Sequence, residues 1–220
     1  MKIEAIERED IVIQLFVKAP VKGKVKTRLI PTLGEKEALK LYKAMLEYMM
    51  ALLCKHRYCN VELWVALDSQ HEFIQRMAKQ YACTVYAQQG ESLGDRMQYA
   101  LAKGLESKQT VVLVGGDCLS VDLAYIKHAV ELLEDKEGAV IGPAEDGGYV
   151  LLAVTKLEAA MFEEIEWGSN RVLKQTLRQC ARQGYDCQLL DIRWDLDRPD
   201  DLQRLAEIPE LEQFSGLKRL

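Results

Sequence analysis

Short apolar runs rich in β-branched residues alternate along the chain with longer segments in which apolar residues recur every three or four positions. Most of the runs are continuously apolar, which is typical of strands covered on both faces. They lie at residues 11–17, 61–67, 83–87, 110–115, 139–142, 149–154 and 187–192. The longer segments have the period of amphipathic helices. They lie at about residues 35–55, 73–81, 93–105, 123–133 and 172–180.

This alternation predicts an α/β protein of three layers, with a mostly parallel mixed sheet between two layers of helices. One connection breaks the pattern, because only residues 143–148 separate two of the runs, too few for a crossover helix. We therefore expect one strand there to be antiparallel or sharply bent. No repeat or linker divides the chain, so we expect a single domain over residues 1–220, with its core at about 11–205.

Polar residues at the predicted helix starts indicate how the helices are capped. Thr32 and Glu35 have the spacing of a capping box for the first helix. Ser120 suits the cap of the helix that follows the fourth strand, and Ser169 or Asn170 suits the cap of the last one.

Composition narrows the class of protein further. Apolar residues make up 49% of the chain and charged residues 29%, as in globular proteins. The net charge of −5 argues against a nucleic-acid binder, and no apolar run approaches the roughly 20 residues that span a membrane. A polar start without a leader favours the cytoplasm, where six cysteines without metal-binding spacing are expected to be free thiols.

The charge is distributed unevenly along the chain. The segment 18–28 carries five cations and no acid, so the other 209 residues carry −10. The cations are Lys18, Lys22, Lys24, Lys26 and Arg28. Together with Gly23 and the hydroxyl of Thr27, this is the chemistry of a phosphate-binding loop, although the segment matches neither a Walker A nor a dinucleotide-binding motif. A solvated lysine-rich surface loop is the alternative.

Acidic residues follow two of the predicted strands. Asp117 comes just after the apolar run 110–115, where a carboxylate needs a partner such as a divalent metal ion; a helix cap is the alternative. In the acidic stretch after the last strand, Asp200 and Asp201 suit the first turn of a helix, which leaves Asp197 as the candidate ligand. Oxygen ligands of this kind suit Mg²⁺ or Mn²⁺. Asp117 should also raise the pKa of Cys118, which argues against a nucleophilic thiol.

Six segments, in their order and spacing, resemble a known family over about residues 11–205. They read FVKAPVKGKVKTRL, QGESLGDRM, VVLVGGDCL, VIGPAEDGGYVLLAV, IEWGSNRVLKQT and DLDRPDDL. The family is DUF2064, bacterial glycosyltransferase-like proteins of which some are associated with radical-SAM and arsenosugar gene clusters. The resemblance implies the GT-A fold of nucleotide-diphospho-sugar transferases, which nucleotidyltransferases also use.

The resemblance assigns roles by position. The nucleotide would contact Lys18, Ala19, Pro20, Gly23, Lys24, Lys26, Thr27, Arg28, Leu93, Gly94, Asp95 and Arg96. The sugar or acceptor would contact Glu145, Asp146, Gly147, Gly148, Tyr149 and Trp167. Asp117 and Asp197 would hold Mg²⁺ or Mn²⁺, and the catalytic residues would be Asp117, Asp146 and Lys26, with Glu145 as another candidate base.

The sequence departs from the family pattern at three positions. Gly116 stands where the family has Ser or Thr, Leu119 stands where it has Pro, and Gly168 replaces the serine of a W-S-T motif. Two hydroxyl groups are thus missing near the expected site, which leaves the acceptor and turnover open.

Three functions fit these observations. The first is a metal-dependent enzyme that transfers a sugar from a nucleotide diphosphate to a small-molecule acceptor. The second is a nucleotidyltransferase that uses a nucleoside triphosphate and releases pyrophosphate. The third is a nucleotide-binding protein without catalysis. Neither a nucleic acid nor a membrane is expected as a partner, and a homodimer is left open.

Overall fold

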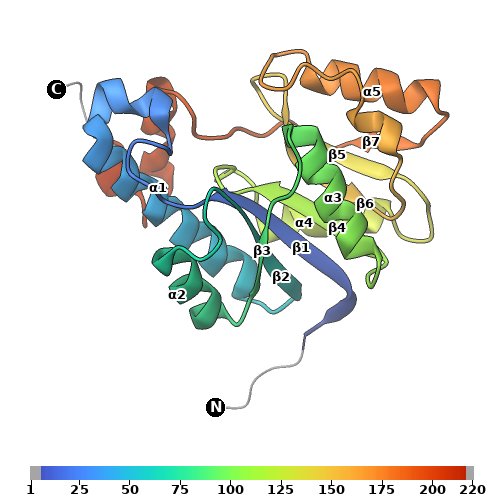
Figure 1. The fold of residues 1–220 in the computed structure, drawn as a ribbon, viewed down its shortest axis with the longest axis horizontal. Helices are drawn as coiled ribbons and strands as arrows, with labels where there is room; N and C mark the ends of the chain where they lie inside the picture. Colours follow the sequence, from blue (N-terminus) through green and yellow to red (C-terminus); the bar gives the residue numbers. More distant parts are fainter. Residues whose placement is uncertain (1–5, 217–220) are drawn as a thin grey trace.

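A seven-stranded mixed sheet runs through the protein in the order β3-β2-β1-β4-β6-β5-β7 (Figure 1). The computed structural model describes residues 6–216. The strands are β1 (Arg8–Lys18), β2 (Cys59–Ala66), β3 (Thr84–Ala87), β4 (Thr110–Gly115), β5 (Ala139–Pro143), β6 (Tyr149–Val154) and β7 (Cys187–Leu189). The α-helices are α1 (Ile30–Cys54), α2 (Glu72–Tyr81), α3 (Leu93–Leu105), α4 (Leu123–Leu132) and α5 (Val172–Arg182). Shorter 3₁₀ helices are η1 (Thr27–Leu29), η2 (Ala159–Phe162), η3 (Pro199–Glu207) and η4 (Glu212–Phe214).

The predicted α/β class and the mostly parallel mixed sheet are confirmed. The short connection between β5 and β6 makes β6 antiparallel to both of its neighbours, β4 and β5. The remaining strand pairs are parallel. The carboxyl ends of the parallel strands therefore meet the amino end of β6 at one edge of the sheet.

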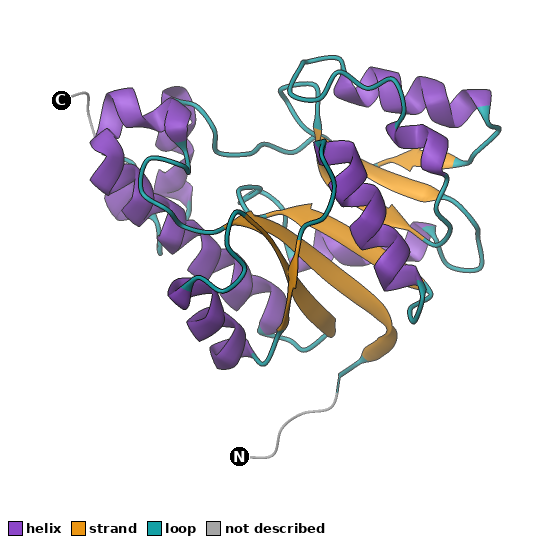
Figure 2. Cartoon of the chain, in the orientation of Figure 1, coloured by secondary structure: helices purple, strands orange, loops and turns teal. Residues whose placement is uncertain are grey.

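Successive side chains of β1, an inner strand of the sheet, point to opposite faces of the sheet and so belong to different parts of the core. Ile13 and Leu15 belong to the cluster that packs with α1, α2 and α4. Val12 belongs to the cluster on the opposite face, which includes residues from α3, η2 and α5. The sheet is thus covered by helices on both sides, as expected for three layers (Figure 2).

Three of the predicted caps are wrong. The first helix begins at Ile30, before the expected capping box, and Glu35 pairs at 3.4 Å with Lys22 instead. A left-handed glycine, Gly34 with φ 74°, kinks the helix between Thr32 and Glu35, so the spacing of a straight first turn is lost.

The other two cap corrections concern α4 and α5. Asp122 caps α4 by accepting a hydrogen bond of 2.7 Å from the backbone N–H of Tyr125. Ser120 is instead bonded to the backbone of Trp194, in a segment distant in sequence. Arg171 lies at the start of α5 without a side-chain cap, although Ser169 Oγ accepts from its backbone N–H at 3.2 Å.

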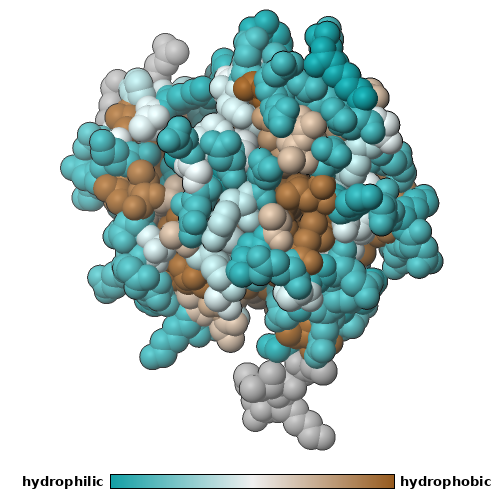
Figure 3. Space-filling view, turned by 45° about the vertical axis from the view of Figure 1, so that its right-hand side comes forward, coloured by the Kyte–Doolittle hydropathy of each residue, from teal (hydrophilic) through white to brown (hydrophobic). Residues whose placement is uncertain are grey.

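The face drawn in Figure 3 is mainly hydrophilic, with hydrophobic residues in small patches. Within residues 6–216, no helix combines the length and the apolar character that crossing a membrane requires. All six cysteines fall in this range and are free thiols, as the sequence predicts.

Candidate functional site

A cleft of about 410 Å³ opens at the edge of the sheet where β1 and β4 end and β6 begins. This volume is in the range of small-molecule sites. Its position agrees with the general rule that open α/β sheets bind ligands beyond the carboxyl ends of their strands. Residues from the loop after β1, the end of β4, the β5–β6 turn, β6, the start of α3 and the segment after β7 line it.

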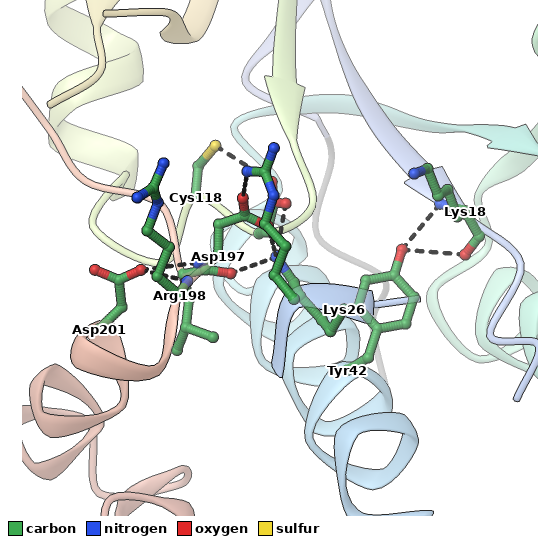
Figure 4. Close-up of polar contacts among 10 residues, drawn as sticks. Lys18, Lys26, Tyr42, Cys118, Asp197, Arg198 and Asp201 are labelled. Atoms are coloured by element: carbon green, nitrogen blue, oxygen red, sulfur yellow. Dashed lines mark hydrogen bonds and ion pairs between the residues drawn. The ribbon is translucent and has the colours of Figure 1, made fainter. Parts of the chain in front are cut away.

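Lys26 lies at the centre of the polar contacts in this cleft (Figure 4). Its backbone is left-handed, with φ 45°, immediately before η1, and its side chain is only 4% exposed. Its Nζ donates to Asp117 Oδ2 at 2.8 Å and to the carbonyl oxygen of Leu196, and it lies 4.0 Å from Asp197 Oδ1. One ammonium therefore joins the loop after β1, the end of β4 and the segment after β7.

Electrostatics keeps the Lys26–Asp117 pair ionised. Burial by itself lowers the pKa of Lys26 and raises the pKa of Asp117, because each charge loses hydration. Their mutual attraction and hydrogen bond outweigh burial, so the pKa of Lys26 is raised and the pKa of Asp117 is lowered.

The basic loop contains two kinds of cation. Lys22 pairs with Glu35, and Arg28 pairs with Asp197. Among residues 6–216, Lys18 and Lys24 make no side-chain hydrogen bond or ion pair, and both line the cleft. The local positive charge is therefore partly neutralised inside the protein, and these two lysines remain available for an anion.

Tyr42 fixes the backbone where β1 ends. Its hydroxyl accepts a hydrogen bond from the backbone N–H of Lys18 at 2.9 Å and donates to the Lys18 carbonyl at 3.1 Å (Figure 4). Burial raises the pKa of this hydroxyl above its ordinary value. Beyond Lys18, the chain turns through Ala19, Pro20 and Gly23, which do not line the cleft.

A third carboxylate lies beside the two expected acids. Asp195 lines the same cleft, and burial followed by repulsion from Asp117 and Asp146 raises its pKa to about 6. The backbone N–H of Leu196 donates to the Asp117 carbonyl at 3.0 Å, which anchors this segment beside β4. Asp195 was missed by the sequence prediction, although its spacing from Asp197 would place both on one side of an extended segment.

The thiol next to Asp117 has the predicted character. Burial, and then the charge of Asp117, raise the pKa of Cys118 well above its ordinary value. A thiol that stays protonated is a poor nucleophile.

At the start of α3, two of the four residues expected to contact the nucleotide line the cleft. These are Leu93 and Arg96, and Arg96 Nε donates to the Gly90 carbonyl at 3.0 Å. Asp95 instead accepts from the backbone N–H of Ser92 at 2.9 Å, in a capping box for α3. Gly94 also does not line the cleft.

Aromatic side chains form another wall. Trp167 packs against Gly94, where a β-carbon would lie 2.7 Å from the indole. Tyr149 meets Trp167 edge-on and Phe162 stacks on it, each with ring centroids 6.4 Å apart. Trp167 and Tyr149 line the cleft, so this wall is largely apolar.

The turn between β5 and β6 contributes some of its expected residues and not others. Asp146 and Gly148 line the cleft. Glu145 does not, because its carboxylate accepts from Arg204 Nη2 at 2.7 Å. Gly147, with φ 90°, lies outside the cleft, and a side chain there would collide with the backbone of Asn170.

Gln88 is a second residue that the sequence prediction missed. It follows β3 and lines the cleft, and its Nε2 donates to the carbonyl oxygens of Val17 at 3.2 Å and Trp64 at 2.9 Å. The side chain therefore joins the ends of β1 and β2 to the loop after β3. A single glutamine after a strand carries no distinctive sequence signal.

The chemistry of the acids fits an oxygen-preferring cation. Four carboxylates line one cleft, those of Asp117, Asp146, Asp195 and Asp197. Burial, followed by repulsion from Asp117 and Asp146, raises the pKa of Asp195. Such ligands suit Mg²⁺ or Mn²⁺. Within the described part of the chain, no three acidic, histidine or cysteine side chains are already gathered around one metal position.

The fold resembles those of known structures over almost the entire chain. A candidate nucleotide-diphospho-sugar transferase from Desulfovibrio desulfuricans G20 is 27% identical, with a TM-score of 0.82 over 95% of this chain and 94% of that one. The inositol-1-phosphate CTP transferase of T. maritima is 14% identical, with a TM-score of 0.56 over 94% and 98% of the two chains. A CMP-2-keto-3-deoxy-manno-octonic acid synthetase complexed with CTP is 10% identical, with a TM-score of 0.58 over 93% and 100%. The fold is therefore that of the nucleotide-sugar and nucleotidyl transferases.

Comparison of sequences identifies the family. No curated protein matches the chain. Residues 49–169, more than half of the chain, match the family of uncharacterized proteins conserved in bacteria, DUF2064. They include the end of β4, the β5–β6 turn and Trp167. The chain belongs to the DUF2064 family.

Proposed function

We propose that the protein transfers a sugar from a nucleotide diphosphate to a small-molecule acceptor. The observation that carries this proposal is the meeting of Lys18 and Lys24, which have no side-chain partner among residues 6–216, with a group of carboxylates in one cleft at the edge of the sheet. The 27% identity to a candidate nucleotide-diphospho-sugar transferase, over nearly the full length of both chains, supports it.

The residues of the basic loop would bind the diphosphate. Lys18 and Lys24 are free to pair with phosphate oxygens, and the half-exposed guanidinium of Arg28 is within reach of solvent. These cations would stabilise the negative charge that grows on the leaving nucleoside diphosphate. A divalent cation held by Asp117 and Asp197 would, when bound, supply further positive charge to the same oxygens.

The acceptor would react on the side of the cleft that Asp146, Tyr149 and Trp167 line. Its hydroxyl or thiol would attack the anomeric carbon, and the bond from that carbon to the diphosphate oxygen would break. The acceptor proton would pass to a carboxylate. Asp146 is better placed for this than Glu145, because it lines the cleft while Glu145 is bonded to Arg204 outside it.

Nucleotidyl transfer is the second candidate, favoured by the likeness of the fold to cytidylyltransferases. An acceptor phosphate would then attack the α-phosphorus of a nucleoside triphosphate, and pyrophosphate would leave. Lys24 and Arg28 would stabilise the departing pyrophosphate.

The two reactions release different products. A panel of nucleotide sugars and nucleoside triphosphates, first screened by thermal shift with and without Mg²⁺, identifies the donor. The protein is then incubated with that donor and a set of acceptors. Release of nucleoside diphosphate from a nucleotide sugar supports glycosyl transfer, whereas release of pyrophosphate from a triphosphate overturns it in favour of nucleotidyl transfer. A donor that binds without release of either product indicates a binding protein.

A further inference from the structure

Two carboxylates of the cleft, those of Asp117 and Asp197, already pair with a cation, the ammonium group of Lys26. We propose that this ammonium is the resident counter-ion of Asp117 and Asp197, and that a divalent metal ion binds these acids only by displacing it. This inference rests on the metal-dependent site of the proposed function. It assigns Lys26 a role in controlling metal access, in addition to any contact with phosphate.

The geometry indicates that Lys26 is built into this position. Its side chain is 4% exposed, and its Nζ bonds to Asp117 Oδ2 and to the Leu196 carbonyl while lying 4.0 Å from Asp197 Oδ1. The backbone at Lys26 is left-handed, which is unusual for a residue with a β-carbon. From this position, immediately before η1, the side chain reaches the carboxylates of Asp117 and Asp197. Another cleft lysine of this loop, Lys24, has no ion pair among residues 6–216.

A metal ion and the ammonium compete for the same carboxylate oxygens. Mg²⁺ takes carboxylate oxygens at about 2.1 Å, so an ion on Asp117 Oδ2 would lie within about 5 Å of an ammonium that is 2.8 Å from that oxygen. Repulsion between a double and a single positive charge at such a distance is unfavourable even in water. Tight binding of the metal ion is therefore expected to be accompanied by departure of the ammonium from the acids.

Displacement of Lys26 would couple metal binding by the acids to phosphate binding in the same cleft. Once away from Asp117 and Asp197, the ammonium has lost its two nearest anions, and a phosphate group in the cleft would give it a new partner. A bound diphosphate would supply that partner, so metal and nucleotide would favour each other's binding. In the absence of nucleotide, the wild-type protein should bind metal ions weakly.

The test measures Mn²⁺ binding alone, by electron paramagnetic resonance, in the full-length protein without nucleotide. Replacing the ammonium with a neutral side chain of similar length, Lys26→Met, should tighten Mn²⁺ binding at least about tenfold, because the competing charge is removed. Lys26→Arg keeps the charge and should bind as weakly as the wild type. Lys24→Met is the matched control: it removes an unpaired lysine of the same cleft and should change the affinity by less than about threefold.

Mn²⁺ binding by Lys26→Met that is no tighter than that of the wild type would overturn the inference. If Lys26→Met does not fold, the ammonium groups of the wild-type protein are followed by NMR during addition of Mg²⁺. Lys26 should lose its protected signal as metal binds, and a signal that persists at metal saturation overturns the inference. Equal metal binding by wild type and variant removes this inference alone, whereas a lack of Mn²⁺ binding by all variants, even with a nucleotide sugar present, removes the proposed metal site as well.

Discussion

The indole of Trp167 lies against Gly94 so closely that a β-carbon at position 94 would be 2.7 Å from the ring. Glycine is therefore required here by contact, because Gly94 lies in α3 and has no left-handed backbone. The contact joins the start of α3 to the aromatic wall of the cleft.

Gly94→Ala should move Trp167 and destabilise the protein. Alanine in a helix is favoured over glycine by about 1 kcal/mol, but overpacking costs roughly 1–3 kcal/mol. We expect the free energy of unfolding to fall by about 1 kcal/mol and the tryptophan emission to change, measured by urea unfolding followed by fluorescence. Gly216→Ala is the control, since a β-carbon there would meet nothing within 4 Å; an unchanged emission in Gly94→Ala would contradict the close packing.

Asp117→Ala should weaken the fold as well as the site. It leaves the buried ammonium of Lys26 without its nearest anion, and loss of a fully buried partner costs about 3–5 kcal/mol. Because the side chain of Asp117 is 37% exposed, we expect a smaller loss of about 2 kcal/mol in the free energy of unfolding. Asp197→Ala removes the partner of a half-exposed arginine and should cost less than about 1 kcal/mol. Equal losses for the two variants in urea unfolding would show that Lys26 does not depend on Asp117.

The contribution of Asp117 should depend on pH in a defined direction. Its pKa is lowered from the ordinary 3.8, so the ionised form is stabilised by folding. The stabilisation is fully present above the unfolded-state pKa and is lost as the pH falls through the lower folded-state pKa. The stability difference between wild type and Asp117→Asn should therefore be constant from neutral pH to about pH 5 and shrink below pH 4. A difference that grows on acidification would contradict the lowered pKa.

Lys24 and Lys22 should differ in their effect on nucleotide binding. Lys24 is unpaired in the described part of the chain and lines the cleft, whereas Lys22 pairs with Glu35 away from it. Lys24→Ala should weaken binding of the best nucleotide diphosphate about tenfold in calorimetry, the scale of a hydrogen bond to a charged group. Lys22→Ala should change it by less than about twofold. Equal effects of the two variants on nucleotide binding would favour the alternative that the loop is a solvated lysine-rich surface.

Cys118 should resist alkylation despite its place in the cleft. Burial and the charge of Asp117 keep the thiol protonated, and iodoacetamide reacts with thiolates. At pH 8 we expect mass spectrometry to find Cys118 unmodified under conditions that modify an unfolded control completely. Rapid labelling of Cys118 in the native protein would contradict this environment.

The strands and helices were largely predictable because their hydrophobic periods are local properties. All seven apolar runs overlap observed strands, and the six-residue connection correctly indicated an antiparallel strand. The caps were less predictable, since they depend on where the chain turns. Gly34 kinks α1 between Thr32 and Glu35, and Ser120 bonds to Trp194, which is 74 residues away.

The sequence by itself determined which residue types reach the binding edge, because it shows which residues follow each strand. In this way it placed the basic loop, Asp117 and Asp197 near one another. Only the tertiary structure decided which of these charges pair with one another. In the part of the chain that the structure describes, Lys22, Lys26 and Arg28 of the positively charged segment pair with acids elsewhere in the chain, and Lys18 and Lys24 have no such partner. Spacing along a chain carries no information on such pairs, since Lys26 and Asp117 are 91 positions apart in the sequence and meet only when β1 and β4 lie side by side.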